Sequence, residues 1–532
     1  MSPPPVEIEP PKESAEPVRR LTAEPIAPPV RIAVNTTRRN FFRAGAAVAA
    51  GSAAAVAMIP RTGPRKRTGD PMLPVPESAA PPAANGETWG SPEIRLARRV
   101  TMGLTPEEAQ LARSKGFGGY LEYHLNYTAI DDAGVAAFVA TNYPQLIMAG
   151  TELYSLDANA VLRQLQDATL FRAAFSKRQL YERMVEFWTD HFSISMRDVG
   201  YLKTIDDREV IRKHALGSFP DMVRASARST AMLVYLDNNT SRVGRINENY
   251  ARELMELHTL GVDGGYTQAD VVAVARCFTG WTIVGRGDFR FDATGHDYAA
   301  KTFLGQTIAA APGTGAAGIG DGDKVIDYLV RHPNTAKYVS SKMIRWLLRY
   351  DPPAALVDQV AAVYMQTNGN IPAMIRAILT RDNVIAAPPK HKRPFHFVAS
   401  AMRGVNPTVR GVAGIAGTRL SLVGQQSFIW ETPDGYPDDV QFWSGLMMQR
   451  WNFGDYLTAL TAGDVIVDIA PFRLVDTPDG ITSAINTALF GGEMPVRTRD
   501  AIRSYLGASA LSATRVREAL ALALNSTTFQ WY

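Results

Sequence analysis

From residue 91 onward, apolar residues recur every three or four positions over many segments, as on a helix with one buried face. Two segments open with a capping residue followed by proline, at Ser91-Pro92 and Thr105-Pro106, which is typical of a helix start. Eight further segments carry the same period, namely 178–193, 205–215, 220–235, 247–260, 268–278, 324–331, 334–349 and 371–380. The pattern predicts a mainly α protein with a large multi-helical globular domain.

Alternation of apolar and polar residues, which indicates a strand, is sparse. The best case is 287–292, where Phe289 and Phe291 fall on one face, so we expect at most a small β-hairpin. Residues 309–323 are rich in Gly, Ala and Pro and are interpreted as a loop, which could also separate two subdomains. Residues 313–318 formally match a dinucleotide-binding glycine pattern. That pattern needs a preceding strand within a parallel sheet, and the chain offers none.

The composition excludes several classes of protein. The chain has 532 residues, of which 46% are apolar, enough for one large domain or two ordinary ones. Its formal net charge is only +4, from 56 basic and 52 acidic residues, which argues against a nucleic-acid partner. The single cysteine, Cys277, excludes an internal disulfide framework and lies in an apolar run, as a core residue would.

The N-terminal segment has the organisation of an export signal. Residues 1–35 are rich in Pro, Glu and Ala and are expected to be disordered. The sequence Thr37-Arg38-Arg39-Asn40-Phe41-Phe42-Arg43 and the weakly apolar stretch after it resemble a twin-arginine signal peptide. That stretch is too short for a spanning helix, and Ala55-Val56-Ala57 offers a cleavage site, so no stable membrane span is expected.

These features predict three parts of the chain. Residues 1–57 form the disordered N-terminus and signal peptide, residues 58–90 a Pro/Ala-rich linker, and residues 91–532 the helical domain. The signal implies the twin-arginine translocase as a partner and a periplasmic or secreted location. Because this route carries folded cargo, it also favours a cofactor inserted before export.

Two predicted helices place a histidine on their apolar face. At 100° per residue, His258 falls beside Ala251 and Leu254, while Glu253 lies toward the flank. His191 falls in the same way on the apolar side of its own helix. A histidine in such a position must be buried and hydrogen-bonded. A third histidine, His296, is followed by Asp297 just after the predicted strand.

Three histidines with nearby carboxylates are sufficient ligands for one transition-metal ion such as zinc, iron or copper. The other interpretation is that each histidine is structural and donates to a carbonyl or carboxylate within the core. No His-Glu-x-x-His motif and no Gly-x-Ser-x-Gly motif is present, so neither that metalloprotease type nor a serine hydrolase is favoured. The aromatic stretch 428–451, with Trp430, Tyr436, Trp443 and Trp451, could line a carbohydrate-binding groove or simply pack on itself.

Several of these motifs resemble the bacterial domain-of-unknown-function-1800 family, over roughly residues 92–453. The matching stretches are 184–192 (MVEFWTDHF), 214–217 (HALG), 235–238 (YLDN), 247–254 (NENYAREL), 265–267 (GYT), 278–281 (FTGW), His296-Asp297 with Lys301, and 433–437 (PDGYP). One departure is His396, where members commonly have a glutamate. The resemblance implies a mainly helical exported protein, encoded beside a sulfatase-like protein, and implies no reaction.

The sequence therefore supports three hypotheses. The first is an exported enzyme, a metal-dependent hydrolase or oxidoreductase, in which His191, His258 and His296 are metal ligands or acid–base groups. In it, Asp297 and Glu253 are further ligands or orienting acceptors, and Lys301 stabilises an anionic intermediate. The second is a non-catalytic partner or scaffold of a sulfatase-like exported protein. The third is a carbohydrate-binding module that uses the tryptophan-rich stretch.

Overall fold

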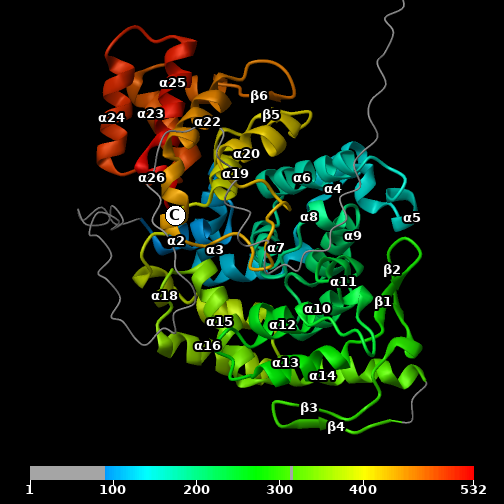
Figure 1. Ribbon diagram of the computed structural model, residues 1–532. Helices are drawn as coiled ribbons and strands as arrows, with labels where there is room; N and C mark the ends of the chain where they lie inside the picture. Colours follow the sequence, from blue (N-terminus) through cyan, green and yellow to red (C-terminus); the bar gives the residue numbers. More distant parts are fainter. Residues whose placement is uncertain (1–89, 312–314) are drawn as a thin grey trace, which may run out of the picture. The chain divides into compact units, whose positions relative to one another are not determined.

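The computed structural model describes residues 90–311 and 315–532 (Figure 1). The predicted signal peptide (1–57) and all of the predicted linker (58–90) except Gly90 lie outside the described residues. The described chain is helical over most of its length, with short two-stranded sheets, which confirms the mainly α prediction. None of its described helices is long and apolar enough to cross a membrane.

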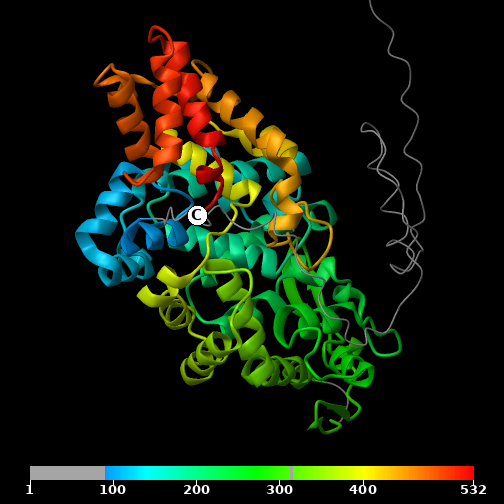
Figure 2. The same ribbon diagram turned by 90° about the vertical axis from the view of Figure 1, so that its left-hand side faces the viewer.

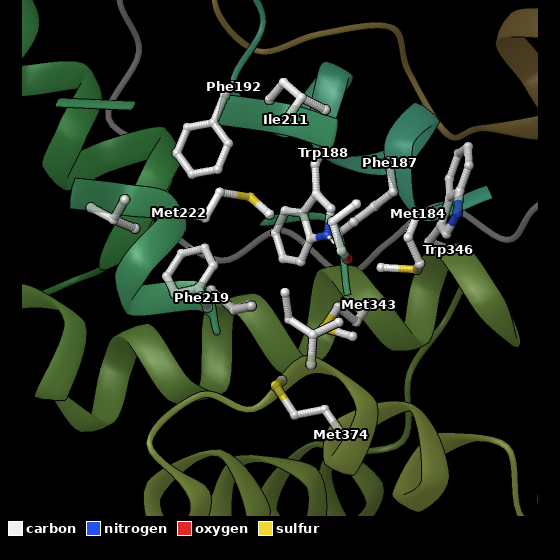
Figure 3. Close-up of a cluster of buried hydrophobic side chains, with 14 of the residues drawn as sticks. Met184, Phe187, Trp188, Phe192, Ile211, Phe219, Met222, Met343, Trp346 and Met374 are labelled. Atoms are coloured by element: carbon white, nitrogen blue, oxygen red, sulfur yellow. Dashed lines mark hydrogen bonds between the residues drawn. The ribbon is translucent and has the colours of Figure 1, made fainter. Parts of the chain in front are cut away.

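One group of helices surrounds a core built mainly from residues 180–387. These helices are α2 (Pro92–Val100), α3 (Pro106–Leu125), α7 (Gln179–His191), α8 (Met196–Val199), α9 (Leu202–Asp206), α10 (Phe219–Ala227), α11 (Thr230–Tyr235), α12 (Asn249–Glu253), α13 (Gln268–Cys277), α14 (Ile319–Arg331), α15 (Pro333–Leu347), α16 (Ala354–Thr367), α17 (Ile371–Ile378) and α18 (Arg381–Ala386). The centre of this core is Trp188, which packs among Phe192, Phe219 and Met222 (Figure 3).

The other group of helices encloses a second core, built mainly from residues 139–174 and 395–529. It consists of α4 (Ala133–Asn142), α5 (Gly150–Leu153), α6 (Ala158–Phe175), α19 (Pro394–Val405), α20 (Leu420–Leu422), α21 (Val440–Trp443), α22 (Met447–Ala459), α23 (Pro478–Phe490), α24 (Val496–Gly507), α25 (Ala513–Asn525) and α26 (Thr527–Gln530). In both views, α22–α25 lie at one end and α12–α16 at the other (Figures 1 and 2). The sequence pattern did not separate these two cores.

The predicted helix starts are confirmed where a side chain caps the helix. Thr105 accepts a hydrogen bond from the backbone N–H of Glu108. Thr267 and Asp270 form the reciprocal capping box at the start of α13. The predicted helix 220–235 is two helices, because α10 ends at Ala227 and Ser229 caps α11.

Two of the predicted helices contain π-helical turns, η6 (Asp207–Arg212) and η8 (Leu254–Thr259). A π turn holds more residues than an α turn, so side chains drift from positions calculated at 100° per residue. At 100° per residue Leu257 falls beside Leu254 on the apolar face, yet it is only half-buried, whereas Met255 is buried. His258 is buried as predicted.

The predicted strand is part of an antiparallel hairpin. Strand β1 (Trp281–Val284) pairs with β2 (Asp288–Phe291), with Trp281 opposite Phe291. Phe289 and Phe291 share one face, as expected. Two further short pairs were not predicted, β3 (Lys301–Phe303) with β4 (Gln306–Ile308) and β5 (Thr408–Val409) with β6 (Val465–Ile466). Helix α14 begins at Ile319, inside the range interpreted as a loop.

Candidate functional site

Helix α7 presents opposite faces to two different environments. Its apolar residues Met184, Phe187 and Trp188 point into the first core (Figure 3). The carboxylates of Glu186 and Asp190, four residues apart, share another face of the helix and border a cavity. The apolar period that makes α7 a core helix therefore also aligns two acids.

Arg393 connects the two carboxylates. It precedes Pro394, the first residue of α19, and its side chain is 4% exposed. Its Nη1 lies 2.6 Å from Asp190 Oδ2, and its Nη2 lies 3.3 Å from Glu186 Oε1. One guanidinium thus bridges both acids, which fixes their separation and supplies a positive charge between them.

A second arginine reaches the same pair from within α7. Arg183 Nη1 lies 3.7 Å from Glu186 Oε2 and donates to His396 Nδ1 at 3.2 Å. Burial and the arginine's charge hold the pKa of His396 well below its usual value, so this histidine is a neutral acceptor. Because His396 is neutral, the positive charge of Arg183 remains directed at Glu186.

The cavity between α6, α7 and the segment 425–436 is small, about 50 Å³. That is room for a few water molecules or one substituent of a larger molecule. Its wall combines Glu186, Asp190 and Arg393 with Trp430 and Tyr436. Both oxygens of Glu186 are buried and accept no hydrogen bond from the described residues. A carboxylate that is ion-paired but accepts no hydrogen bond, beside a cavity, is available to a donor on a ligand.

The loop that covers the cavity is held at specific points. Phe428 has φ 66°, a left-handed conformation that a bulky residue rarely adopts, and its carbonyl accepts the N–H of Met196 at 2.7 Å. Tyr436 donates its hydroxyl to the carbonyl of Gln426 at 2.6 Å. At Gly435, with φ 75°, an added Cβ would lie 2.2 Å from the carbonyl oxygen of Asp190, so only glycine allows this approach.

Burial shifts the pKa values of the two acids and of one lysine in opposite directions. Desolvation raises the pKa of both Glu186 and Asp190, and the nearby arginines, above all Arg393, oppose this shift only in part. On α15, burial lowers the pKa of Lys342 to about 8, against the attraction of Asp190 and Asp434. The site therefore holds groups whose pKa values move toward neutrality, as catalytic acids and bases require.

The structure brings together two of the predicted site histidines, His191 and His258. Their ring centroids are 6.1 Å apart, and His191 Nε2 lies 3.1 Å from the backbone oxygen of His258. Both are buried among aromatic side chains such as Phe192. Burial holds the pKa of His191 well below its usual value and lowers that of His258 to about 3, so both rings are neutral.

The other predicted site residues belong to a different network. His296 Nδ1 donates to the carbonyl of Thr279 at 2.8 Å, and its Nε2 lies 3.3 Å from Asp321 Oδ2. Lys301 Nζ donates to the same Asp321 oxygen at 2.7 Å. Asp297 pairs with Arg276 at 2.7 Å. All of these side chains are buried except those of Arg276 and Asp321, which are partly buried. The network joins the loop before β3 to α13 and α14.

Glu253 is half-buried on α12, one turn before His258. No group of three or more His, Cys, Asp or Glu side chains among residues 90–311 and 315–532 is placed to hold a metal ion. Both ring nitrogens of His296 are engaged by Thr279 and Asp321, whereas His191 contacts His258. The expected ligand set of His191, His258 and His296 is therefore not assembled in the part of the chain that is described.

Glu186, Asp190, Arg393 and Lys342 were not among the residues predicted to form a site. On a helical wheel, Glu186 lies opposite the apolar face, where an acid is ordinarily solvated. The signal that could have identified this pair is the run Lys390-His391-Lys392-Arg393, because adjacent basic residues require partners if they are buried. The glycine-centred 433–437 motif, which contacts the end of α7, was a second signal.

Comparison with known proteins places this site within a family. The family described as protein of unknown function DUF1800 has a model that matches residues 95–531, which include every residue of the cavity wall. No curated protein and no solved structure matches the chain. The match extends well beyond the range 92–453 over which the motifs were recognised, and it takes in the C-terminal helices. The chain therefore belongs to the DUF1800 family.

Proposed function

We propose that the protein is an exported enzyme that uses Glu186 and Asp190 as a general acid and a general base. The observation that carries this proposal is the arrangement of the pair at the cavity. Arg393 bridges the two acids, and both Glu186 oxygens are left without a hydrogen bond from the described residues. Burial raises the pKa of both acids, which is the direction that favours a carboxyl acting as a proton donor.

Hydrolysis is the reaction class that this arrangement supports best. One carboxyl can protonate a leaving oxygen while the other takes a proton from water, as paired carboxyls do in glycoside cleavage. The cavity, about 50 Å³, admits the scissile group and a water but not a whole sugar ring. Arg393 remains protonated throughout, holds both carboxylates and stabilises the negative charge left when either loses its proton.

No step is assigned to a metal, because the predicted histidine ligands are not assembled among the described residues. The transition metal expected from the sequence is tested by metal analysis of protein matured in its natural host. About one equivalent of bound metal would support that expectation. Hydrolysis that persists after chelation, with less than about 0.2 equivalents of any transition metal, supports the carboxyl mechanism instead.

The direct experiment is hydrolysis of a panel of chromogenic esters, glycosides and phosphate esters by the purified protein. We expect Glu186→Gln and Asp190→Asn each to lower the rate by about 100-fold or more. The matched control is Glu248→Gln, which alters an exposed ion pair with Arg252. Unchanged rates in both site variants would overturn the proposal. The second measurement is the infrared band of protonated carboxyls during a pH titration. A band that persists to higher pH than that of an exposed glutamate should disappear in Glu186→Gln.

A carbohydrate ligand is a second candidate, favoured by the aromatic side chains beside the acids. Trp430 lies 4.7 Å from Tyr436 and 6.1 Å from Phe442 between ring centroids, and Phe442 is 49% exposed. Such a surface suits stacking of a sugar ring whose substituent enters the cavity. Binding to a polysaccharide panel that is lost in Trp430→Ala supports this candidate. Equal binding by both proteins contradicts it.

We propose that the enzyme acts in the periplasm or outside the cell and that the twin-arginine translocase delivers it there. Its support is the sequence Arg38-Arg39 and the small-residue cleavage site, which lie outside the described residues. A co-encoded sulfatase-like protein is the proposed partner. Replacement of both arginines by lysine should retain the protein in the cytoplasm. If, in addition, the Glu186 and Asp190 variants behaved as wild type in every assay, the non-catalytic scaffold would be the better hypothesis.

A further inference from the structure

Four consecutive basic side chains, Lys390-His391-Lys392-Arg393, are all buried, with exposures of 0%, 4%, 4% and 4%. The outer two form ion pairs with carboxylates, since Lys390 Nζ lies 2.7 Å from Asp438 and Arg393 lies 2.6 Å from Asp190. The central two form no ion pair with any carboxylate of the described residues. Lys392 donates to the hydroxyl of Ser400 at 2.8 Å, and His391 contacts Trp531 edge to face.

A buried arginine, Arg450 on α22, adjoins this central pair. Its side chain is 0% exposed, and its Nη1 donates to Gln530 Oε1 at 3.0 Å. Its Nε and Nη2 atoms have no hydrogen-bond partner among the described residues, and neither does His391 Nδ1. The three groups meet at the end of the chain, because the backbone N–H of Lys392 donates to the carbonyl of Gln530 at 2.9 Å and His391 pairs with the next residue, Trp531. In agreement, the charge of Arg450 lowers the pKa of both His391 and Lys392, after the larger effect of burial.

The two unpartnered atoms of Arg450 lie on the same edge of its guanidinium group. The N–H bonds of Nε and Nη2 point in parallel, and this edge binds oxyanions in a bidentate manner. Burying an arginine without a counter-charge is unfavourable, because the guanidinium loses its hydration and gains no opposite charge. A negative ion at this edge would remove this penalty and would also satisfy the two donors.

We propose that Arg450, Lys392 and His391 bind one small anion, a halide or a small oxyanion, between α22 and the segment that leads into α19. The surrounding side chains are buried, which excludes a large ligand. The anion ties the C-terminal helices to the segment that ends in Arg393. It is therefore a structural ion for the face of the molecule that carries the cavity, and it does not depend on the proposed hydrolysis.

Thermal unfolding of the full chain at constant ionic strength tests this proposal. Sodium gluconate would be replaced stepwise by sodium chloride, bromide, acetate or phosphate. One class of anion should raise Tm by about 2–5 °C in a saturable manner. Chloride and bromide together indicate a halide site, whereas acetate or phosphate alone indicates an oxyanion site. Identical Tm values in all five salts would overturn the proposal.

Two variants show where the anion acts. Arg450→Met should abolish the anion-dependent rise in Tm. Arg419→Met should retain it, because Arg419 lies near the same helix over the ring of Tyr456 and outside the cluster. If Arg450→Met does not fold, crystals of the wild-type chain grown in bromide provide the second measurement. An anomalous peak beside Arg450 supports a halide, and an oxyanion-shaped density there supports the other class. Density for neither ion at Arg450 overturns the proposal.

Discussion

Two buried polar clusters in this protein use similar side chains but differ in how completely they are paired. Around Asp321, the side chains of His296, Lys301 and Asp297 all have hydrogen-bond partners. Around Arg393, both oxygens of Glu186 lack a hydrogen bond and border a cavity. A fully paired cluster stabilises a loop, whereas an incompletely paired cluster beside a cavity is available to a ligand. The difference identifies the Arg393 cluster as the better candidate site.

The largest expected effect is that of Arg393→Met. It leaves two buried carboxylates without their shared cation, and breaking such a pair costs about 3–5 kcal/mol at neutral pH. Urea unfolding followed by circular dichroism measures the change. The control is Arg252→Met in an exposed ion pair, where the loss should stay below about 1 kcal/mol. Equal effects of the two substitutions would show that the Arg393 cluster is not electrostatically coupled.

The Asp321 cluster should respond to Asp321→Asn with a somewhat smaller loss of about 2–4 kcal/mol, because Lys301 is then buried without a counter-charge. If the cluster only stabilises the loop, the double variant Asp321→Asn with Lys301→Met should recover part of the lost stability, because no buried lysine is then left without a counter-charge. Hydrolytic activity per folded molecule should not change. A loss of activity without a loss of stability would instead support the original assignment of Lys301 and Asp297 to the catalytic site.

The comparison also shows which aspects of the molecule the sequence could reveal. Helix periods and caps were sufficient to predict the mainly α fold. An amphipathic face and a cap such as Thr105 or Thr267 depend only on residues close together in the sequence. They did not reveal that η8 is a π turn, since its hydrogen-bond pattern is set by packing. The helical wheels correctly predicted that His191 and His258 are buried.

The candidate site was less accessible to sequence reasoning. The partners of Glu186 and Asp190 lie about 200 residues further along the chain, at Arg393. A wheel shows that an acid is opposite the apolar face, but it cannot show that a second core covers that face. The same limit applies to His296, whose two engaged nitrogens depend on the fold of α13 and α14.

The pH dependence of stability gives a smaller effect with a defined sign. Because burial raises the pKa of Glu186 in the folded state, the folded protein keeps this proton at pH values where the unfolded chain has lost it. The stability gained from this proton is fully present below the unfolded pKa, near 4.5, and is lost as pH rises through the folded value. Glu186→Gln should therefore become more stable relative to wild type as pH rises from about 4.5 to 8, by about 1.4 kcal/mol for each unit of pKa shift.

Glu122 is the control for that sign. Its hydrogen bonds to Arg376 lower its pKa in the folded state, so its contribution is present above the unfolded pKa and is lost as pH falls. Glu122→Gln should therefore lose stability relative to wild type as pH rises, by less than about 1 kcal/mol because this pair is exposed. Denaturation midpoints at five pH values measure both slopes. Slopes of the same sign would contradict the assignment of Glu186 as the desolvated acid.

The smallest expected effect concerns the aromatic side chains outside the cavity. Phe442 is 49% exposed and contacts Trp430 and Trp443 only edge-on, so Phe442→Ala should lower stability by no more than about 1 kcal/mol. Trp443 is 1% exposed and donates to the carbonyl of Pro437 at 2.7 Å, so Trp443→Ala should cost about 3–5 kcal/mol. Thermal unfolding distinguishes them. A near-neutral Phe442 variant means that the stability of the fold does not require this exposed ring, which leaves it available to contact a ligand at the cavity mouth. A large loss would instead show that the ring belongs to the packing of the loop and would remove it from the binding surface.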